Sequence, residues 1–194
     1  MTRFLLVPGR GVPRPGHWQQ RWAAGRPDHR WAHPPSGPPY RLDERVAALH
    51  AAVTADDEPA VLIAHSAGCL TTVVWAARHI GPVRAALLVA PPYVGPDWLS
   101  EMDGTVVAAL EGRLPFRSVL VASRTDPHAS WEQSRRYAER WGAELVDVGD
   151  AGHVDTGGGY GPWPEGERLV VRLATAPEAG SDPDPDPGRP ADRA

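Results

Sequence analysis

The chain has 194 residues, which favours a single domain large enough to bury its own core. Its formal net charge of -4 at pH 7 argues against general binding of nucleic acid, because such proteins usually carry a basic patch. The single cysteine excludes an internal disulfide, and no apolar run is long enough to span a membrane. We therefore expect a cytoplasmic protein that binds neither nucleic acid nor membranes.

Short apolar runs rich in Val and Leu recur along residues 1–173. They show little strict alternation of polar and apolar residues, which is typical of strands covered on both faces of a parallel sheet. The expected strands are Phe4–Val7, a weaker one at His29–His33, Val61–Ala64, Ala85–Ala90, Ser118–Ala122 and Glu144–Val148.

Helical patterns separate these runs. Apolar spacing and stop signals predict helices over residues 42–53, 66–79, 129–141 and 164–174. The alternation predicts an α/β fold, a doubly wound and mostly parallel sheet with helices on both faces. The segment 91–115 has room for about one helix, so no large cap domain is expected. Residues 174–194 are rich in Pro, Asp and Ala, and we expect a disordered tail there.

Reactive side chains follow three of the predicted strands. Ser66 follows the strand that ends at Ala64, Asp126 follows the strand that ends at Ala122, and His153 comes after residues 144–148. Ligands of doubly wound sheets bind beyond the carboxyl ends of the strands. The chain order Ser, Asp, His is that of the α/β-hydrolases. The pattern therefore predicts a catalytic triad in which histidine takes the serine proton and aspartate orients the imidazole.

The serine lies in the sequence AHSAG, residues 64–68, where a strand is followed at once by a helical pattern. This is typical of a nucleophile elbow, a sharp turn that needs small residues two before and two after the serine. The usual motif is G-x-S-x-G, and Ala64 replaces its first glycine. The backbone N–H groups of Ala67 and of Arg10, in the loop after the first strand, are the predicted oxyanion donors.

Ordinary structural explanations exist for these residues as well. Ser66 is a good helix N-cap residue, and Asp126 stands where a turn former is common. Three other carboxylates near His153 are less suitable partners than Asp126. Two of them are too close to His153 in the sequence, and the third belongs to the preceding strand. These alternative acids are Asp147, Asp150 and Asp155.

Several stretches resemble a family of small serine hydrolases that includes the retinoblastoma-binding serine hydrolase and bacterial YdeN-like proteins. They are FLLVPGRGVPRPGHWQQRW at 4–22, VLIAHSAGC at 61–69, SRTDP at 123–127 and AGHVDTGGGYGPWPEG at 151–166. The resemblance spans about residues 3–173. It implies a compact α/β-hydrolase with no large cap and a triad of Ser66, Asp126 and His153, acting on esters or amides. Ala64 and the acidic tail depart from the family pattern.

Residues near the predicted triad are candidates for the wall of a substrate pocket. We expect His65, Trp18 and Trp163 to contact substrate, although most large aromatic side chains pack in cores. Cys69 is expected to be buried packing and not a nucleophile. The histidines show no metal-ligand spacing supported by carboxylates, so neither a metal site nor a cofactor is predicted.

The sequence thus predicts a serine hydrolase that cleaves small carboxylic esters, or amides as a second choice, through an acyl-enzyme. The alternative is a non-catalytic protein-interaction module on the same fold, although no motif names a partner. A dinucleotide-binding protein fits poorly, because PGRGVPRPG lacks the G-x-G-x-x-G spacing and the acidic residue downstream of it.

Overall fold

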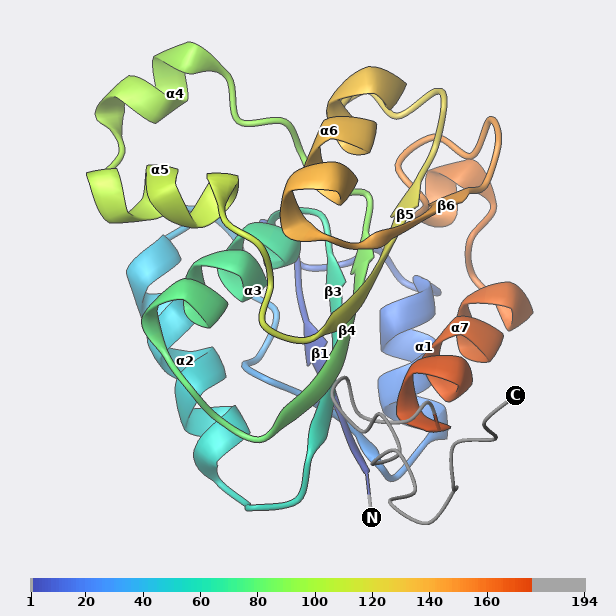
Figure 1. The fold of residues 1–194 in the computed structure, drawn as a ribbon. Helices are drawn as coiled ribbons and strands as arrows, with labels where there is room; N and C mark the ends of the chain where they lie inside the picture. The colour runs from blue at the N-terminus through green and yellow to red at the C-terminus, as the bar shows by residue number, and fades with distance from the viewer. Residues whose placement is uncertain (1, 176–194) are drawn as a thin grey trace, which may run out of the picture.

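A six-stranded sheet forms the centre of the fold (Figure 1). The computed structural model describes residues 2–175 and orders the strands β2-β1-β3-β4-β5-β6, with every neighbouring pair parallel. The predicted doubly wound parallel sheet is therefore confirmed. The strands are β1 (Arg3–Val7), β2 (His29–Trp31), β3 (Ala60–His65), β4 (Val83–Val89), β5 (Arg117–Ala122) and β6 (Glu144–Asp147).

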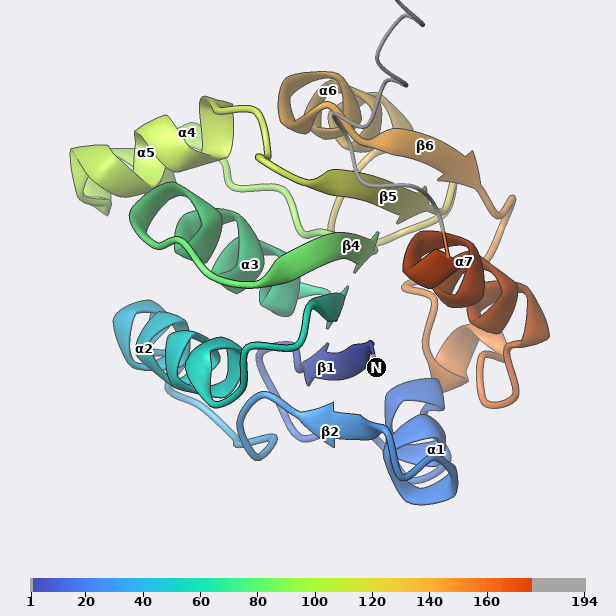
Figure 2. The ribbon, with the colours of Figure 1, turned by 60° about the horizontal axis from the view of Figure 1, so that its bottom comes forward.

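Helices cover both faces of this sheet, as Figure 2 shows. One face carries α2 (Leu42–Thr54), α3 (Ala67–Arg78), α5 (Gly104–Glu111) and α6 (Trp131–Trp141). The other face carries α1 (Trp18–Gly25) and α7 (Pro164–Thr175). The short helix α4 (Pro96–Glu101) and the 3-10 turn η1 (Thr156–Gly158) lie in the connections.

Strand residues alternate between two apolar cores, one on each side of the sheet. In β3, Leu62 and Ala64 belong to the core shared with α2, α3, α5 and α6, whereas Val61 and Ile63 belong to the core shared with α1 and α7. All four side chains are fully buried. This burial on both faces explains why the strands read as continuous apolar runs.

The structure adds helices that the sequence did not predict. Helix α1 has too few residues for a clear periodic pattern, yet it buries Trp18, Gln19 and Trp22. The segment 91–115 holds α4 and α5 where one helix was expected, and these short helices do not form a large cap domain.

The first two residues of the predicted tail are helical in the structure. Ala174 and Thr175 belong to helix α7, and Ala174 packs against the core on that face of the sheet. The rest of the predicted tail, 176–194, lies outside the described residues.

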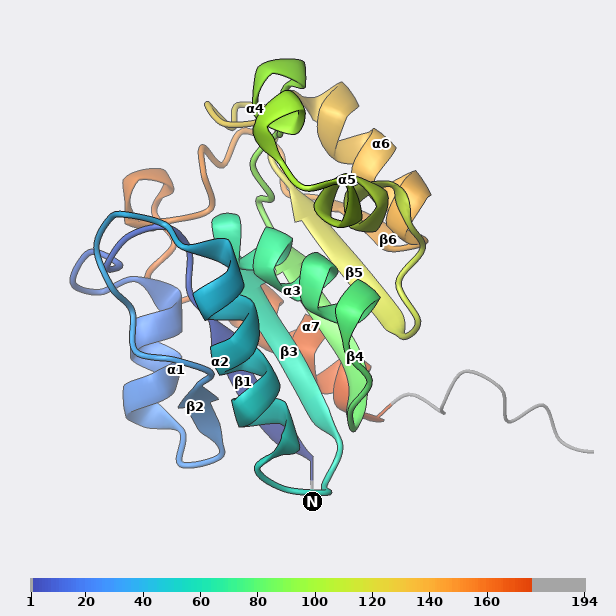
Figure 3. The ribbon, with the colours of Figure 1, turned by 90° about the vertical axis from the view of Figure 1, so that its left-hand side faces the viewer.

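The carboxyl ends of all six strands lie at one edge of the sheet, the upper edge in Figure 1 and Figure 3. The loops that follow β1, β3, β5 and β6 therefore converge there, and these are the loops that carry the predicted reactive residues. Within residues 2–175, no helix has the length and apolar character needed to cross a bilayer.

Candidate active site

Ser66 occupies a strained turn between β3 and α3. Its backbone has φ 54° and ψ -128°, a region that residues other than glycine rarely adopt. Although Ser66 is the N-cap residue of α3, its side chain makes no capping hydrogen bond. The hydroxyl is directed elsewhere, so capping does not account for this serine.

Glycines on both sides allow the backbone to approach this turn closely. A Cβ atom added to Gly68 would collide with the carbonyl oxygens of Val7 and Pro8. A Cβ added to Gly9 would lie 3.1 Å from the Cβ of Ser66 and 3.3 Å from the carbonyl oxygen of His65. The loop after β1 is thus packed directly against the elbow. Ala64, the departure from the usual motif, is buried in the core at the end of β3.

A continuous chain of hydrogen bonds joins Ser66, His153 and Asp126. The distance from Nε2 of His153 to Oγ of Ser66 is 2.9 Å, and Nδ1 lies 3.0 Å from each carboxylate oxygen of Asp126. Because a carboxylate only accepts hydrogen bonds, Nδ1 carries the proton of the neutral imidazole. Nε2 is then an acceptor for the serine hydroxyl.

The Asp126 carboxylate is almost completely shielded, with 2% of its side chain exposed. It also accepts the backbone N–H of His128 at 2.9 Å, which fixes its orientation. The structure places none of the alternative acids against His153. Asp147 pairs with Arg124, Asp150 is exposed, and Asp155 accepts the N–H groups of Gly157 and Gly158.

Side chains from distant elements hold the loop that carries His153. The indole N–H of Trp18 in α1 donates to the carbonyl of Val154 at 2.9 Å. Nε2 of His65, at the end of β3, donates to the carbonyl of His153 itself at 2.9 Å. Val154 has φ 49°, so the loop needs such contacts to stay in an unfavourable conformation.

The loop after β5 supports the same segment from the other side. Oγ of Ser123 accepts the N–H of Ala151 at 2.9 Å, and Oγ1 of Thr125 accepts the N–H of Gly152 at 3.1 Å. Since Asp126 lies in this β5 loop, Asp126 and His153 are positioned by one shared set of hydrogen bonds.

Two uncharged histidines lie beside Ser66 and His153. Burial lowers the pKa of His17 from 6.5 to about 4, and burial lowers the pKa of His65 well below its ordinary value. Their rings are 4.8 Å apart, and the ring of His65 is 4.9 Å from that of His153. At neutral pH neither ring adds a positive charge beside His153.

Gln19 bonds to both β1, which precedes the loop of Gly9 and Arg10, and β3, which precedes Ser66. Its amide Nε2 donates to the carbonyl of Val7 at 3.2 Å and to the carbonyl of Ile63 at 3.1 Å. These carbonyls lie at the carboxyl ends of β1 and β3. Gln19 is fully buried, so its bonds fix the spacing between the β1 loop and the elbow.

Arg45 holds the β1 loop from the opposite face of the sheet. Its guanidinium donates to the carbonyls of Gly9 at 2.9 Å and Arg10 at 3.4 Å, and to the hydroxyl of Ser36 at 3.2 Å. It lies 4.7 Å from the ring centre of Tyr40, whose hydroxyl donates to the carbonyl of Ala67 at 2.7 Å. Arg45 and Tyr40 thus link the loop after β1 to the first turn of α3.

Cavities open on both sides of Ser66. The larger cavity, of about 340 Å³, is lined by Leu70, Pro92, Tyr93, Val94 and Trp98 among others. The smaller cavity, of about 230 Å³, is lined by His17, His65, His153, Asp155 and Thr156 among others. Ser66 and Arg10 belong to both walls, whereas Ala67 belongs to the larger cavity.

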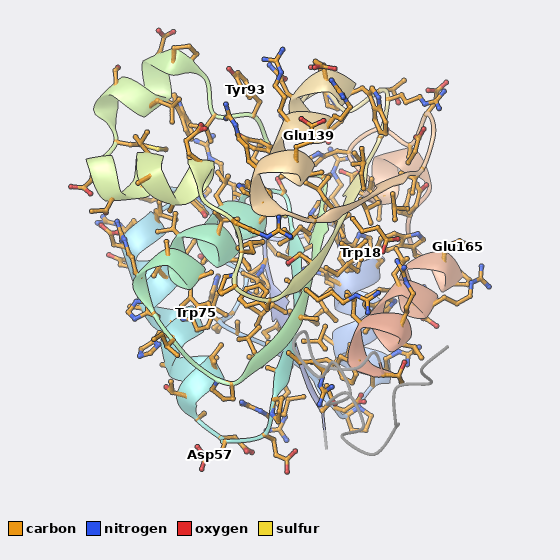
Figure 4. All side chains as sticks on the ribbon, viewed as in Figure 1. Trp18, Asp57, Trp75, Tyr93, Glu139 and Glu165 are labelled. Carbon is orange, nitrogen blue, oxygen red and sulfur yellow. The ribbon has the colours of Figure 1, made fainter. Side chains whose placement is uncertain are left out.

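The structure corrects two of the predicted pocket residues. Trp18 and Trp163 have exposed fractions of 0% and 2%. Their rings pack together in the core between the sheet and the helices α1 and α7. Figure 4 shows Trp18 inside the molecule, while Tyr93 lies at the upper edge between α4 and α6. Of the three predicted pocket residues, His65 does line a cavity that contains Ser66.

Cys69 is fully buried on α3, and its thiol donates to the carbonyl of Val89 at 3.4 Å. Burial raises its pKa, so the thiol stays protonated and serves as packing. In the part of the chain that the structure describes, no group of three or more His, Cys, Asp or Glu side chains is arranged to hold a metal ion.

Comparison with known proteins assigns the chain to a family. The model of the serine hydrolase family matches residues 4–172. The chain belongs to the serine hydrolase family. This confirms the family resemblance and makes the protein a serine hydrolase. Among curated proteins, none matches this sequence.

Solved structures similar to this serine hydrolase share its fold over most of the chain. A YdeN-like hydrolase of Pectobacterium atrosepticum is 28% identical, the match covers 90% of this chain and 91% of that one, and the TM-score is 0.80. The ydeN gene product of B. subtilis is 16% identical, with coverages of 91% and 100% and a TM-score of 0.71. The Pyrococcus furiosus esterase Pf2001 is 19% identical, with coverages of 87% and 80% and a TM-score of 0.55. These likenesses confirm the α/β-hydrolase fold.

Sequence reasoning missed the supporting roles of Gln19, Arg45 and Trp18. Each lies on a helix, and each donates to backbone carbonyls of a loop or strand far away in the sequence. For Arg45 the available signal was a charged residue on the apolar face of the helix predicted over 42–53, whereas no helix was predicted around Trp18 and Gln19, so no signal was available there.

Replacing Gly9 by alanine should impair the site with little effect on the fold. The added methyl would displace the β1 loop from Ser66, so we expect turnover of an ester substrate to fall about tenfold or more. Gly104→Ala is the matched control, because nothing lies within 4 Å of its added Cβ. Equal turnover by both variants, measured beside thermal unfolding, would contradict the close packing described.

Buried His17 should make the protein sensitive to acid. Because its folded pKa of about 4 lies below 6.5, the unfolded chain binds protons more readily, and stability present above pH 6.5 is lost as the pH falls toward 4. The free energy of unfolding should drop by about 2 kcal/mol between roughly pH 8 and pH 5 through this group alone. Urea titrations at both pH values measure the drop.

His17→Asn keeps a side-chain acceptor for the helix cap and should remove this part of the pH dependence. His128→Asn replaces an exposed histidine and serves as the control. If His17→Asn lost as much stability in acid as the unmodified protein, His17 would not be the neutral buried group inferred.

Proposed function

We propose that the protein hydrolyses small carboxylic esters through an acyl-enzyme formed on Ser66. His153 is the general base and acid, and Asp126 holds its imidazole in the required tautomer. The observation that carries this proposal is the hydrogen-bonded chain from Oγ of Ser66 through His153 to Asp126, with distances of 2.9 and 3.0 Å. It is supported by the family assignment.

The chemistry follows from the positions of the protons in the hydrogen bonds that join Ser66, His153 and Asp126. Oγ of Ser66 attacks the ester carbonyl carbon while its proton passes to Nε2 of His153. The tetrahedral intermediate collapses, the bond to the alcohol oxygen breaks, and that oxygen takes the proton from Nε2. Water then attacks the acyl-serine, giving its proton to Nε2, and the serine hydroxyl is restored as the carboxylic acid leaves. Asp126 stabilises the imidazolium in both halves.

The negative charge on the carbonyl oxygen needs donors, and we assign them to the N–H groups of Ala67 and Arg10. Ala67 is the first residue of α3, where the helix dipole favours an anion. The Gly9–Arg10 peptide is trans, so its N–H points opposite to its carbonyl. Because Arg45 holds that carbonyl, the N–H of Arg10 is directed away from Arg45 and its orientation is fixed.

Esters are favoured over amides as substrates. An alcohol departs from the tetrahedral intermediate more readily than an amine, so an ester requires less assistance from the site. The similar structure from Pyrococcus furiosus is titled an esterase, which supports the same choice.

Substitutions within the triad test the proposal. Ser66→Ala should lower ester turnover to background, and Asp126→Asn should lower kcat by about 10³- to 10⁴-fold, because the amide favours the wrong imidazole tautomer. Ser118→Ala is the matched serine control. Ser118 lies at the amino end of β5, away from Ser66, and its hydroxyl donates to the carbonyl of Phe116 just before that strand. Substantial activity in folded Ser66→Ala would rule out the acyl-enzyme.

Arg45→Met should separate positioning from binding. Without the guanidinium the β1 loop loses its anchor, so we expect kcat to fall about tenfold to a hundredfold while KM changes little. Arg45→Lys keeps a donor and should recover part of the loss. A variant whose KM rises while kcat is unchanged would show that Arg45 acts on substrate binding and not on the oxyanion loop.

A further inference from the structure

The two cavities beside Ser66 differ in the chemistry of their walls. The larger cavity presents mainly carbon surface from the first turn of α3 and from the segment between β4 and α4, including Leu70, Val94 and Trp98. The smaller cavity presents imidazoles, a carboxylate and a hydroxyl from His17, Asp155 and Thr156. A substrate bound across Ser66 would therefore place two dissimilar parts in them.

The position of His153 determines which part of an ester enters which cavity. The imidazole must give its proton to the alcohol oxygen as that oxygen leaves, so the alcohol has to lie on the side of His153. His153 lines the smaller cavity and is not among the residues that line the larger one. Of the two proposed oxyanion donors, Arg10 lines both cavities and Ala67 lines the larger one. The acyl carbon chain then extends away from His153 into the larger cavity.

We propose that the larger cavity binds the acyl group and the smaller cavity binds the alcohol. The preferred substrate is then an ester of a short to medium apolar carboxylic acid with a compact polar alcohol. This inference rests on the proposed ester hydrolysis at Ser66 and specifies its substrate class.

Size and exposure support the acyl assignment. A volume of about 340 Å³ lies at the low end of small-molecule sites, which span roughly 300–1,000 Å³. Tyr93 and Trp98 are 43% and 52% exposed, although both have large aromatic side chains. Exposed aromatic rings on the wall of a cavity gain contact when an apolar chain enters.

Unsatisfied polarity supports the alcohol assignment. Oγ1 of Thr156 is buried and has no hydrogen-bond partner among the described residues. A buried hydroxyl without a partner is unfavourable, so a rotation of the Thr156 side chain that brings Oγ1 to a second hydroxyl on the alcohol would supply the missing bond. Nδ1 of His17 accepts the N–H of Gln19, so the neutral ring carries its proton on Nε2 as a further donor in that wall.

An isomeric pair of esters tests the assignment directly. 2-Hydroxyethyl hexanoate and hexyl glycolate contain the same atoms, but the apolar chain is on the acyl side in the first and on the alcohol side in the second. Each kcat/KM is divided by the rate of hydrolysis by hydroxide, which removes the difference in intrinsic reactivity. We expect 2-hydroxyethyl hexanoate to be preferred by about tenfold or more.

Two variants assign the halves to their cavities. Trp98→Ala changes an exposed side chain and should lower the preference for hexanoate over acetate esters about fivefold, with the alcohol kept constant. Thr156→Val should lower the preference for 2-hydroxyethyl over ethyl hexanoate about two- to tenfold and leave the hexanoate-to-acetate ratio unchanged. The assignment would be overturned if Trp98→Ala changed the 2-hydroxyethyl-to-ethyl ratio and Thr156→Val changed the hexanoate-to-acetate ratio instead.

The outcomes separate this inference from the function on which it rests. Preference for hexyl glycolate would reverse the assignment, and the proposed hydrolysis at Ser66 would stand. Cleavage of neither ester by a protein whose Ser66 still reacts with a fluorophosphonate would overturn the substrate class alone. Cleavage of neither ester by a folded protein that does not react would overturn the proposed function and this inference with it.

Discussion

The contact on which the site depends is the imidazole of His153, held between the hydroxyl of Ser66 and the carboxylate of Asp126, which follow two different strands. Ser66 and His153 are separated by 87 positions, yet Oγ of the first and Nε2 of the second lie 2.9 Å apart. The parallel sheet brings the strand ends to one edge, but it does not fix a loop to this precision. That task falls to buried donors, Trp18 and His65, which bond the carbonyls of Val154 and His153. His153 is therefore positioned through its own backbone as well as through Asp126.

A second group of buried polar side chains positions the loop after β1. Gln19 bonds the ends of β1 and β3, and Arg45 bonds the carbonyls of the loop itself. Buried polar groups are unfavourable unless their hydrogen bonds are made, so these side chains resist any shift of the loop. Gly9 completes the arrangement, because a side chain there would push the loop away from Ser66. Neutral His17 and His65 leave the surroundings of the base without added positive charge.

Sequence reasoning succeeded where local pattern decides the structure. Strands such as β3 are buried on both faces and read as apolar runs, and Ser66, Asp126 and His153 follow strand ends in a recognisable order. It failed where partners far along the chain decide. Trp18 and Trp163 stand in loop-like segments, but they pack on each other in the core. The partners of Gln19 lie 12 and 44 positions away, and a single sequence contains no sign of such pairings.

The most direct test of this account is the site at which a fluorophosphonate becomes attached, located by peptide mass mapping of the folded protein and of Ser66→Ala. Phosphonylation needs a serine whose proton is removed by a neighbouring base, which is the property assigned to Ser66. We expect one adduct, on the peptide that contains Ser66, and none in the variant. An adduct on another serine, or no adduct on well-folded protein, would contradict it.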